Sequence, residues 1–174
     1  ASDVYKRQAL AGALRVRCLT GAKAALGDVP ASIVSCAGAT VMAALDTACP
    51  SMDSLKEKRV LVVGLGMLGL LAVEAALRAG AAVTATDPNS HRRRYAAQLG
   101  ACISGFSDFD PALDIVENFD VALEFSSSPQ GVITCLKPLD INGVAVLAGS
   151  VADSPAIDLP RMDCPRLAHC YRRA

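Results

Sequence analysis

Three glycines that directly follow an aliphatic run are the residues of this chain whose spacing best fits a chemical role. The segment 59–69 reads RVLVVGLGMLG, with glycines at positions 64, 66 and 69. Gly64 permits a tight turn, Gly66 leaves room for a pyrophosphate against the backbone, and Gly69 allows the next helix to pack closely on the strand. A helix that begins near Met67 would direct free N–H groups and the positive end of its dipole at the phosphates. The pattern predicts a dinucleotide site at this turn.

An acidic residue follows the glycines where such a site needs one. Residues 82–86 form a second short apolar segment that leads to Asp87, about twenty residues past the glycines. Its carboxylate can accept hydrogen bonds from the adenosine ribose and would repel a 2'-phosphate, which favours NAD over NADP. A different role for Asp87 is to open an Asp-Pro-Asn turn. The basic residues 91–94 can bind an extra phosphate if Asp87 turns away, or can simply form a solvated helical turn.

Short apolar segments alternate with helical ones along the chain. Strands are expected at 60–63, 82–86, 101–103, 121–125 and 144–148, and helices at 30–48, 67–79, 90–99, 111–117 and 129–136. This alternation predicts an α/β fold, a doubly wound parallel sheet flanked by helices, with ligands at the carboxyl ends of the strands. Such a sheet has six strands, but the prolines at 155, 160 and 165 disfavour another strand after residue 150. We therefore expect the sheet to be truncated at its last strand.

The composition argues against several other classes of protein. Seventeen basic and seventeen acidic residues give a formal net charge of zero, so no long-range field favours nucleic acid or an anionic membrane. The longest apolar stretch, 60–73, is too short to span a membrane and is interrupted by the glycines. The seven cysteines include no CxxC pair, which indicates reduced thiols and a cytoplasmic protein.

An ordered set of motifs gives the chain a family resemblance. The motifs are SCAGATVMAAL (35–45), RVLVVGLGMLGLLAVEAA (59–76), Asp87, RRRYAAQLGA (92–101), DVALEFSSSP (120–129) and GVAVLAGS (143–150). In this order and spacing they resemble the nucleotide-binding half of medium-chain, zinc-type alcohol dehydrogenases, including relatives of threonine and sorbitol dehydrogenase. The resemblance implies a Rossmann fold and hydride transfer between an alcohol and NAD. It divides the chain into a remnant of an N-terminal catalytic, GroES-like domain with a candidate non-native start (1–28), an NAD-binding domain (29–162) and an irregular tail (163–174).

The resemblance also implies cofactor contacts for single residues. These are Thr40, Gly64, Leu65, Gly66, Met67, Leu68, Gly69, Asp87, Arg92, Phe125, Ser126, Ala148 and Gly149. Residues 65–68 match the pyrophosphate turn, and Arg92 matches a basic residue on the adenosine side. Phe125, Ser126, Ala148 and Gly149 match strand ends that line the nicotinamide. Thr40 matches a hydroxyl residue near that ring, although a threonine inside an apolar helix often bonds to its own backbone.

Cys36 is the candidate metal ligand. In some branches of the family, the residue one helical turn before that threonine supplies a third protein ligand to a catalytic zinc, beside another thiolate, an imidazole and water. Zinc would lower the pKa of the alcohol so that hydride can leave for the nicotinamide. The alternative for Cys36 is plain packing, because cysteine is among the most buried residue types. The remaining zinc ligands and the proton relay belong to an upstream domain, so we expect a fragment that binds cofactor but carries no catalytic residues.

Two other function classes remain open. The first is a zinc-free quinone or enoyl reductase of the same superfamily, which usually prefers NADPH; Asp87 and Cys36 argue against it. The second is a non-enzymatic NAD-binding module, which needs a self-contained sheet and is disfavoured by a missing sixth strand. For the dehydrogenase, the resemblance implies a small-molecule alcohol as substrate and a homo-oligomer for the full-length enzyme.

Overall fold

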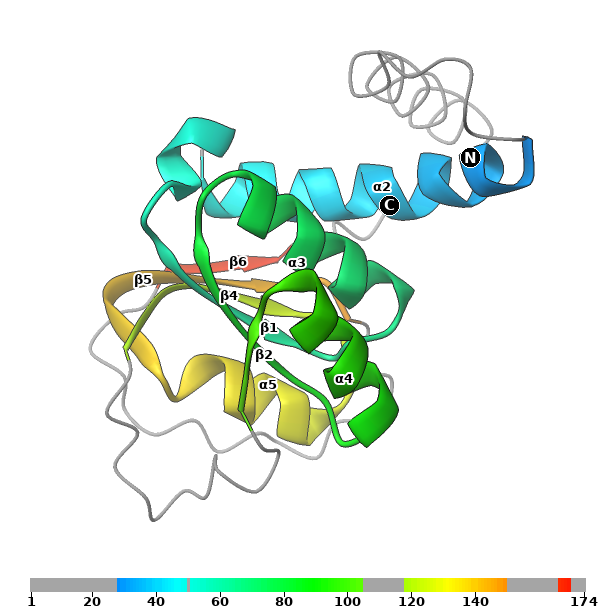
Figure 1. The fold of residues 1–174 in the computed structure, drawn as a ribbon. Helices are drawn as coiled ribbons and strands as arrows, with labels where there is room; N and C mark the ends of the chain where they lie inside the picture. The colour runs from blue at the N-terminus through cyan, green and yellow to red at the C-terminus, as the bar shows by residue number, and fades with distance from the viewer. Residues whose placement is uncertain (1–27, 50, 105–117, 150–165, 170–174) are drawn as a thin grey trace, which may run out of the picture.

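Strands alternate with helices throughout the described part of the chain. The computed structural model describes residues 28–49, 51–104, 118–149 and 166–169. Its elements are α2 (Asp28–Ala48), the 3-10 turn η1 (Met52–Leu55), β1 (Arg59–Val63), α3 (Met67–Arg78), β2 (Ala82–Thr86), α4 (Ser90–Leu99), β3 (Cys102–Ile103), β4 (Phe119–Glu124), α5 (Pro129–Leu136), β5 (Leu139–Leu147) and β6 (Arg166–His169). The strands form one sheet in the order β3-β2-β1-β4-β5-β6, and all neighbours pair in parallel (Figure 1). The predicted doubly wound α/β fold is confirmed.

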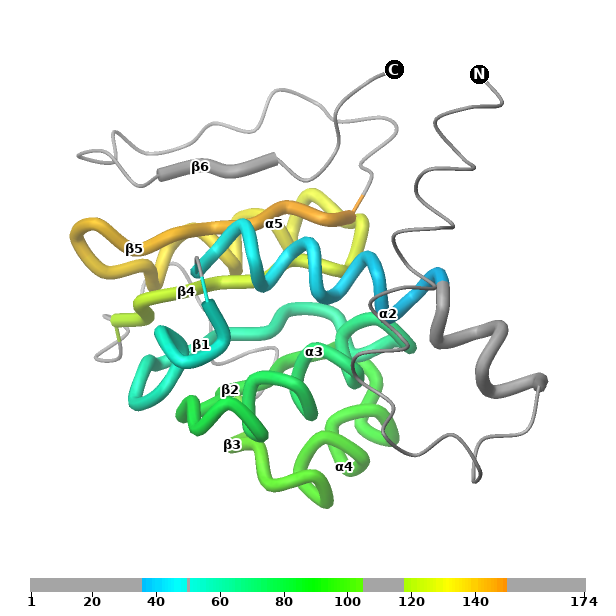
Figure 2. The backbone as a smooth tube through the Cα atoms, turned by 90° about the horizontal axis from the view of Figure 1, so that it is seen from above, coloured from blue at the N-terminus to red at the C-terminus, as the bar shows by residue number. Residues whose placement is uncertain are grey.

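Helices cover both faces of the sheet. Helices α2, α3 and α4 lie on one face and α5 lies on the other, as Figures 1 and 2 show. Successive side chains of a strand point to opposite faces, so Val60 and Val62 pack into the core under α2 and α3. Leu61 and Val63 pack into the core under α5. Both faces of β1 are therefore buried, which explains why its sequence shows no polar alternation.

Helices α4 and α5 begin at capping residues, and α4 ends at a glycine. Helix α4 starts after Asn89, whose side-chain oxygen accepts hydrogen bonds from two backbone N–H groups of its first turn, and ends at Gly100 with φ 108°. Helix α5 starts after Ser128, which accepts from the N–H of Gly131 at 2.9 Å. The expected bounds of both helices are confirmed.

Within the described ranges, no helix has the length and apolar character needed to cross a membrane.

The end of the sheet differs from the expectation. Strand β6 pairs with β5 from Val144↔Arg166 to Leu147↔His169, so the sheet is not truncated after five strands. Four residues of the expected irregular tail are therefore strand, while the domain boundaries themselves stay predictions. Strand β6 follows Pro165 directly and lies at the sheet edge, a place where a neighbouring proline is tolerated. The helix expected at 111–117 lies outside the described residues.

Candidate cofactor-binding site

The glycine turn joins the carboxyl end of β1 to α3. Gly64 has φ 89°, in the left-handed region, and its N–H donates to the carbonyl of Thr86 at 3.0 Å. A Cβ on Gly69 would collide with the carbonyl oxygen of Gly64, so α3 approaches the turn too closely for any side chain there. By contrast, nothing lies within 4 Å of the position that a Cβ on Gly66 would take. The three glycines have the geometry that their predicted roles require, and the ligand contacts stay predictions.

The N-terminus of α3 carries no side-chain cap. Its N-cap residue is Gly66, and its first turn contains no acidic residue. Helices α4 and α5, in contrast, are capped by Asn89 and Ser128. The first N–H groups of α3 thus retain their capacity to bind an anion, and the helix dipole favours one. Together with the open space at Gly66, this helix end suits a phosphate.

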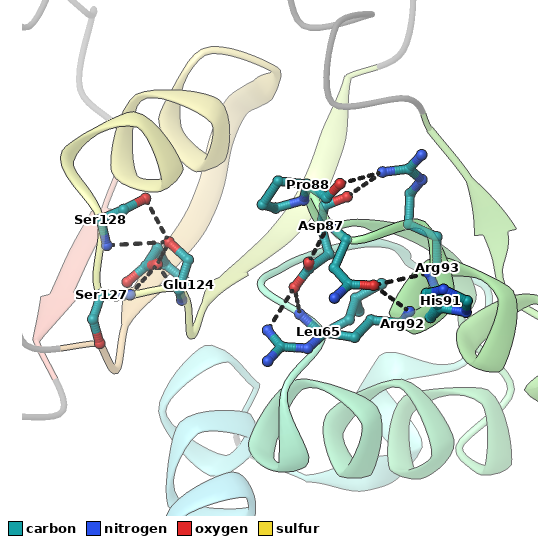
Figure 3. A network of polar contacts seen from close by, with 11 residues as sticks. Leu65, Asp87, Pro88, His91, Arg92, Arg93, Glu124, Ser127 and Ser128 are labelled. Atoms are coloured by element: carbon teal, nitrogen blue, oxygen red, sulfur yellow. Dashed lines mark hydrogen bonds and ion pairs between the residues drawn. The ribbon is translucent and has the colours of Figure 1, made fainter.

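Asp87, which directly follows β2, is hydrogen-bonded to the glycine turn. Its side chain is 3% exposed, and Oδ2 accepts a hydrogen bond from the backbone N–H of Leu65 at 2.7 Å. Oδ1 accepts from the backbone N–H of Asn89, also at 2.7 Å (Figure 3). The Asp-Pro-Asn turn therefore forms, and the same carboxylate also faces the glycine turn. An ionised carboxylate has about four acceptor positions, of which these two N–H groups take two, and the contact of Asp87 with a ribose stays a prediction.

The basic residues 91–94 differ in their surroundings. The guanidinium of Arg92 lies 3.5 Å from Oδ2 of Asp87 and is 53% exposed. Arg93 is partly exposed, and it donates to the backbone carbonyls of Asp87 and Pro88. His91 and Arg94 are exposed. Arg92 is thus the basic residue of this group that lies beside the predicted ribose acceptor (Figure 3).

The predicted nicotinamide residues lie at two adjacent strand ends. Phe125 and Ser126 follow β4, and Ala148 and Gly149 follow β5. The backbone N–H groups of Ala148 and Gly149 both donate to the carbonyl of Glu124, at 3.0 and 3.1 Å. The structure therefore brings these four residues together at the carboxyl edge of the sheet, on the side of β1 opposite to β2.

Glu124, the last residue of β4, is a candidate that the sequence analysis missed. Its side chain is fully buried, and Oε1 accepts hydrogen bonds from the N–H and hydroxyl of Ser126 and from the N–H of Ser127. Oε2 has no hydrogen-bond partner among the described residues. Burial and, to a lesser degree, the charge of Glu124 raise the pKa of the Cys135 thiol. The available signal was an acidic residue that ends an apolar strand and precedes three serines able to donate to it.

The structure gives weaker support to the two candidate residues of α2, Thr40 and Cys36. The hydroxyl of Thr40 donates to the carbonyl of Cys36 at 3.1 Å, which is the bond to its own backbone considered above. The side chain of Cys36 is exposed. In the part of the chain that the structure describes, no group of three or more His, Cys, Asp or Glu side chains could hold a metal ion. These residues do not form a zinc site by themselves, and Cys36 stays a prediction whose further ligands would lie elsewhere.

Comparison with protein families identifies the class of this chain. Residues 68–169, more than half of the chain, match the family described as zinc-binding dehydrogenase. The chain belongs to this family. The expected membership in the zinc-type alcohol dehydrogenases is thereby confirmed.

Individual relatives agree with this membership. L-threonine 3-dehydrogenase from Legionella pneumophila is 32% identical over 106 residues, which are 57% of this chain and 31% of the relative. The same enzyme from Burkholderia cenocepacia is 33% identical over 106 residues, with the same coverage. The chain thus spans about a third of the length of the curated relatives that it matches.

Solved structures share the fold. Acetophenone reductase from Geotrichum candidum, in complex with NAD, has a TM-score of 0.71 and 25% identity, covering 84% of this chain and 42% of that one. L-idonate 5-dehydrogenase from Escherichia coli has a TM-score of 0.60 and 25% identity, covering 81% of this chain and 42% of that one.

Proposed function

We propose that this chain is the cofactor-binding part of an NAD-dependent, zinc-type alcohol dehydrogenase that transfers hydride between an alcohol and NAD. The observation that carries the proposal is the uncapped start of α3 beside open backbone at Gly66, with the buried carboxylate of Asp87 held against the same turn. Family membership supports the reaction class, and the structural relative solved with NAD supports the cofactor. For the complete enzyme we extend the proposal to a small-molecule alcohol, zinc, a homo-oligomeric state and the cytoplasm.

The order of the strands indicates how the cofactor would lie. Strand β1 has β2 on one side and β4 on the other, with β5 beyond β4. A pyrophosphate at the α3 N-terminus would therefore direct the adenosine toward Asp87 and Arg92 after β2. The other half of the dinucleotide would run toward Ser126 and Gly149. The catalytic groups of the dehydrogenase would come from outside the described residues.

Cofactor preference tests the proposal. Titration of the protein with NADH and NADPH, followed by the fluorescence of the reduced nicotinamide, should show tighter binding of NADH, because the Asp87 carboxylate accepts ribose hydroxyls and repels a 2'-phosphate. Asp87→Ala should erase the preference. Asp87→Asn keeps an acceptor for the buried Leu65 N–H but removes the charge, so it should also weaken the preference while sparing the turn. Equal affinities in the unmodified protein would contradict the assignment.

A matched control separates the role of Asp87 from a general effect of charge. Asp53, in η1, is exposed and precedes β1 in the chain. Asp53→Asn changes the net charge by the same amount as Asp87→Asn and should leave the preference for NADH unchanged. Tighter binding of NADPH by the unmodified protein would favour the zinc-free reductase class instead.

A second candidate function gains support from β6. A non-enzymatic NAD-binding module needs a self-contained sheet, and the sixth strand removes the objection that the sheet is incomplete. The two candidate functions differ in whether the protein catalyses the reduction of NAD. The dehydrogenase predicts that the full-length, zinc-loaded protein reduces NAD in the presence of an alcohol, whereas the module predicts NAD binding without reduction by any of a panel of primary and secondary alcohols.

A further inference from the structure

We propose that Glu124 is a positioning residue that fixes the distance between the glycine turn and the end of β5, and thereby aligns the two halves of the dinucleotide site. The proposal rests on the proposed function, since it concerns the same site. It assigns a role to a residue that contacts neither of the predicted phosphate and ribose positions.

The turn after β4 is built around the Glu124 carboxylate. Oε1 accepts three hydrogen bonds from the second and third residues after it: from the N–H and hydroxyl of Ser126 and from the N–H of Ser127, the last at 3.1 Å (Figure 3). Ser127 has φ 57°, a left-handed conformation that a residue with a side chain rarely adopts. Successive backbone N–H groups that converge on one anionic oxygen stabilise such a turn. The carboxylate therefore supports an otherwise unfavourable backbone shape.

This turn is packed between two glycines from neighbouring strand ends. A Cβ on Gly64 would lie 2.6 Å from the backbone nitrogen of Ser126. A Cβ on Gly149 would collide with Oε2 of Glu124 and lie 2.7 Å from the nitrogen of Ser127. At the ends of β1 and β5 there is thus no room for a side chain at either glycine. A shift of the Ser126–Ser127 turn would be transmitted to both glycines.

The stability of the fold does not explain why position 124 carries a carboxylate. Glu124 is fully buried, and the ion pairs of the described residues do not include it. Its Oε2 also lacks a hydrogen-bond partner among these residues. A buried carboxylate without an ion partner is unfavourable even when one of its oxygens is well bonded. The geometry that it imposes on the turn accounts for its presence.

The test compares binding of the whole dinucleotide with binding of its adenosine half. The 174-residue chain and its Glu124→Gln variant are titrated with NADH and with AMP, and thermal unfolding is recorded for both proteins. Glutamine keeps the size and one acceptor but loses the charge that strengthens three hydrogen bonds. NADH affinity should fall by about tenfold, because a turn that the carboxylate no longer holds in shape must be ordered when the cofactor binds. AMP affinity should fall clearly less, because AMP reaches only the glycine turn and Asp87, which lies on the far side of β1.

Further variants make the test specific. Ser126→Ala removes one donor to Oε1 and leaves the carboxylate, so it should weaken NADH binding less than Glu124→Gln does, again with a smaller effect on AMP. If Glu124→Gln does not fold, Glu124→Asp decides the question: it keeps the charge but shortens the side chain that reaches Ser126 and Ser127, so it should also weaken NADH binding more than AMP binding. Glu74→Gln is the matched control, since Glu74 is 41% exposed and pairs with Arg78 on α3. It should change neither affinity.

The outcomes separate the two proposals. Unchanged NADH affinity in Glu124→Gln overturns the role of Glu124 and leaves the proposed function intact. A parallel loss of NADH binding, AMP binding and unfolding temperature in both site variants shows a merely structural residue and also overturns it. If the unmodified chain binds neither NADH nor AMP, the proposed function fails, and the role of Glu124 fails with it.

Discussion

Gly66 provides a sharp test of the phosphate site, because the fold should tolerate an alanine at this position whereas a bound phosphate should not. Its backbone has φ −73° and ψ −162°, which any residue can adopt, and nothing lies within 4 Å of the position of a Cβ. Gly66→Ala should stabilise the fold by about 0.4–1 kcal/mol through the unfolded chain. Alanine is a worse N-cap than glycine by roughly 0.5–1 kcal/mol. The two effects offset each other, so we expect the free energy of unfolding to stay within about 1 kcal/mol of the unmodified value.

The same methyl group should strongly reduce cofactor binding. It occupies the open space in which a phosphate would contact the start of α3. Loss of one hydrogen bond to a charged group costs about 1.5–3 kcal/mol, which is roughly a 10- to 150-fold increase in the Kd for NADH. A fluorescence titration measures this Kd, and thermal unfolding of the same sample should show a change in Tm of at most about 4 °C.

Gly69→Ala is the matched comparison. Its Cβ would collide with the carbonyl oxygen of Gly64, so it should lower the free energy of unfolding by about 1–3 kcal/mol and weaken NADH binding as well. Unchanged NADH binding by Gly66→Ala would show that no phosphate lies against this residue and would refute the reasoning. A large loss of stability in Gly66→Ala would instead contradict the open space described at the turn.

Further predictions concern the cap of α4 and the thiols. Asn89→Ala removes the acceptor for two N–H groups of the first turn of α4 and should cost about 1 kcal/mol in urea unfolding; no change would contradict its role as a cap. Iodoacetamide at pH 8 should modify the exposed Cys36 and Cys102 in the native protein but spare Cys135, whose thiol pKa is raised by burial; peptide masses decide this. An unfolded cysteine ionises near about pH 8.5, whereas folded Cys135 stays protonated, so stability should fall as the pH rises above that value. Cys135→Ala should reduce this slope, and an unchanged slope would contradict the assignment.

Local sequence was sufficient to predict the elements around the glycine turn. The unbroken aliphatic run of β1 predicts a strand buried on both faces, and the structure confirms it. Helix α4 ends where Gly100 adopts a left-handed conformation, which was the expected stop signal. In these cases the residue types themselves restrict the backbone. The fold class followed from the alternation of such elements.

The far edge of the sheet could not be predicted in this way. Strand β6 has only four residues, which is too few for a recognisable periodicity, and it exists through its pairing with β5. Strand β5 begins at Leu139 rather than at residue 144, across a register irregularity between Phe119 and Val121 of its partner β4. Pairing with a neighbouring strand is a tertiary interaction, and it outweighs local propensity here.

The candidate site was predictable to different degrees on its two sides. The distance from the glycines to Asp87 predicts a carboxylate beside the turn, and the structure places it there; its contact with ribose stays a prediction. Thr40 is predicted to lie near the nicotinamide; its hydroxyl donates to the backbone of its own helix, and its contact with the cofactor stays a prediction. The role of Glu124 depends on the shape of the turn that follows it. That shape is known only once β4 and β5 are placed beside one another.

Asp87 and Glu124 together show how the glycine turn is held before any ligand binds. They lie at the ends of β2 and β4, the two strands that flank β1. Asp87 receives the N–H of Leu65, inside the turn, while Glu124 fixes the segment that packs against Gly64. The turn is thus restrained from both sides by buried carboxylates that accept backbone N–H groups. Because its shape is set in advance, a phosphate that binds there need not order the turn, and more of the interaction energy remains as affinity.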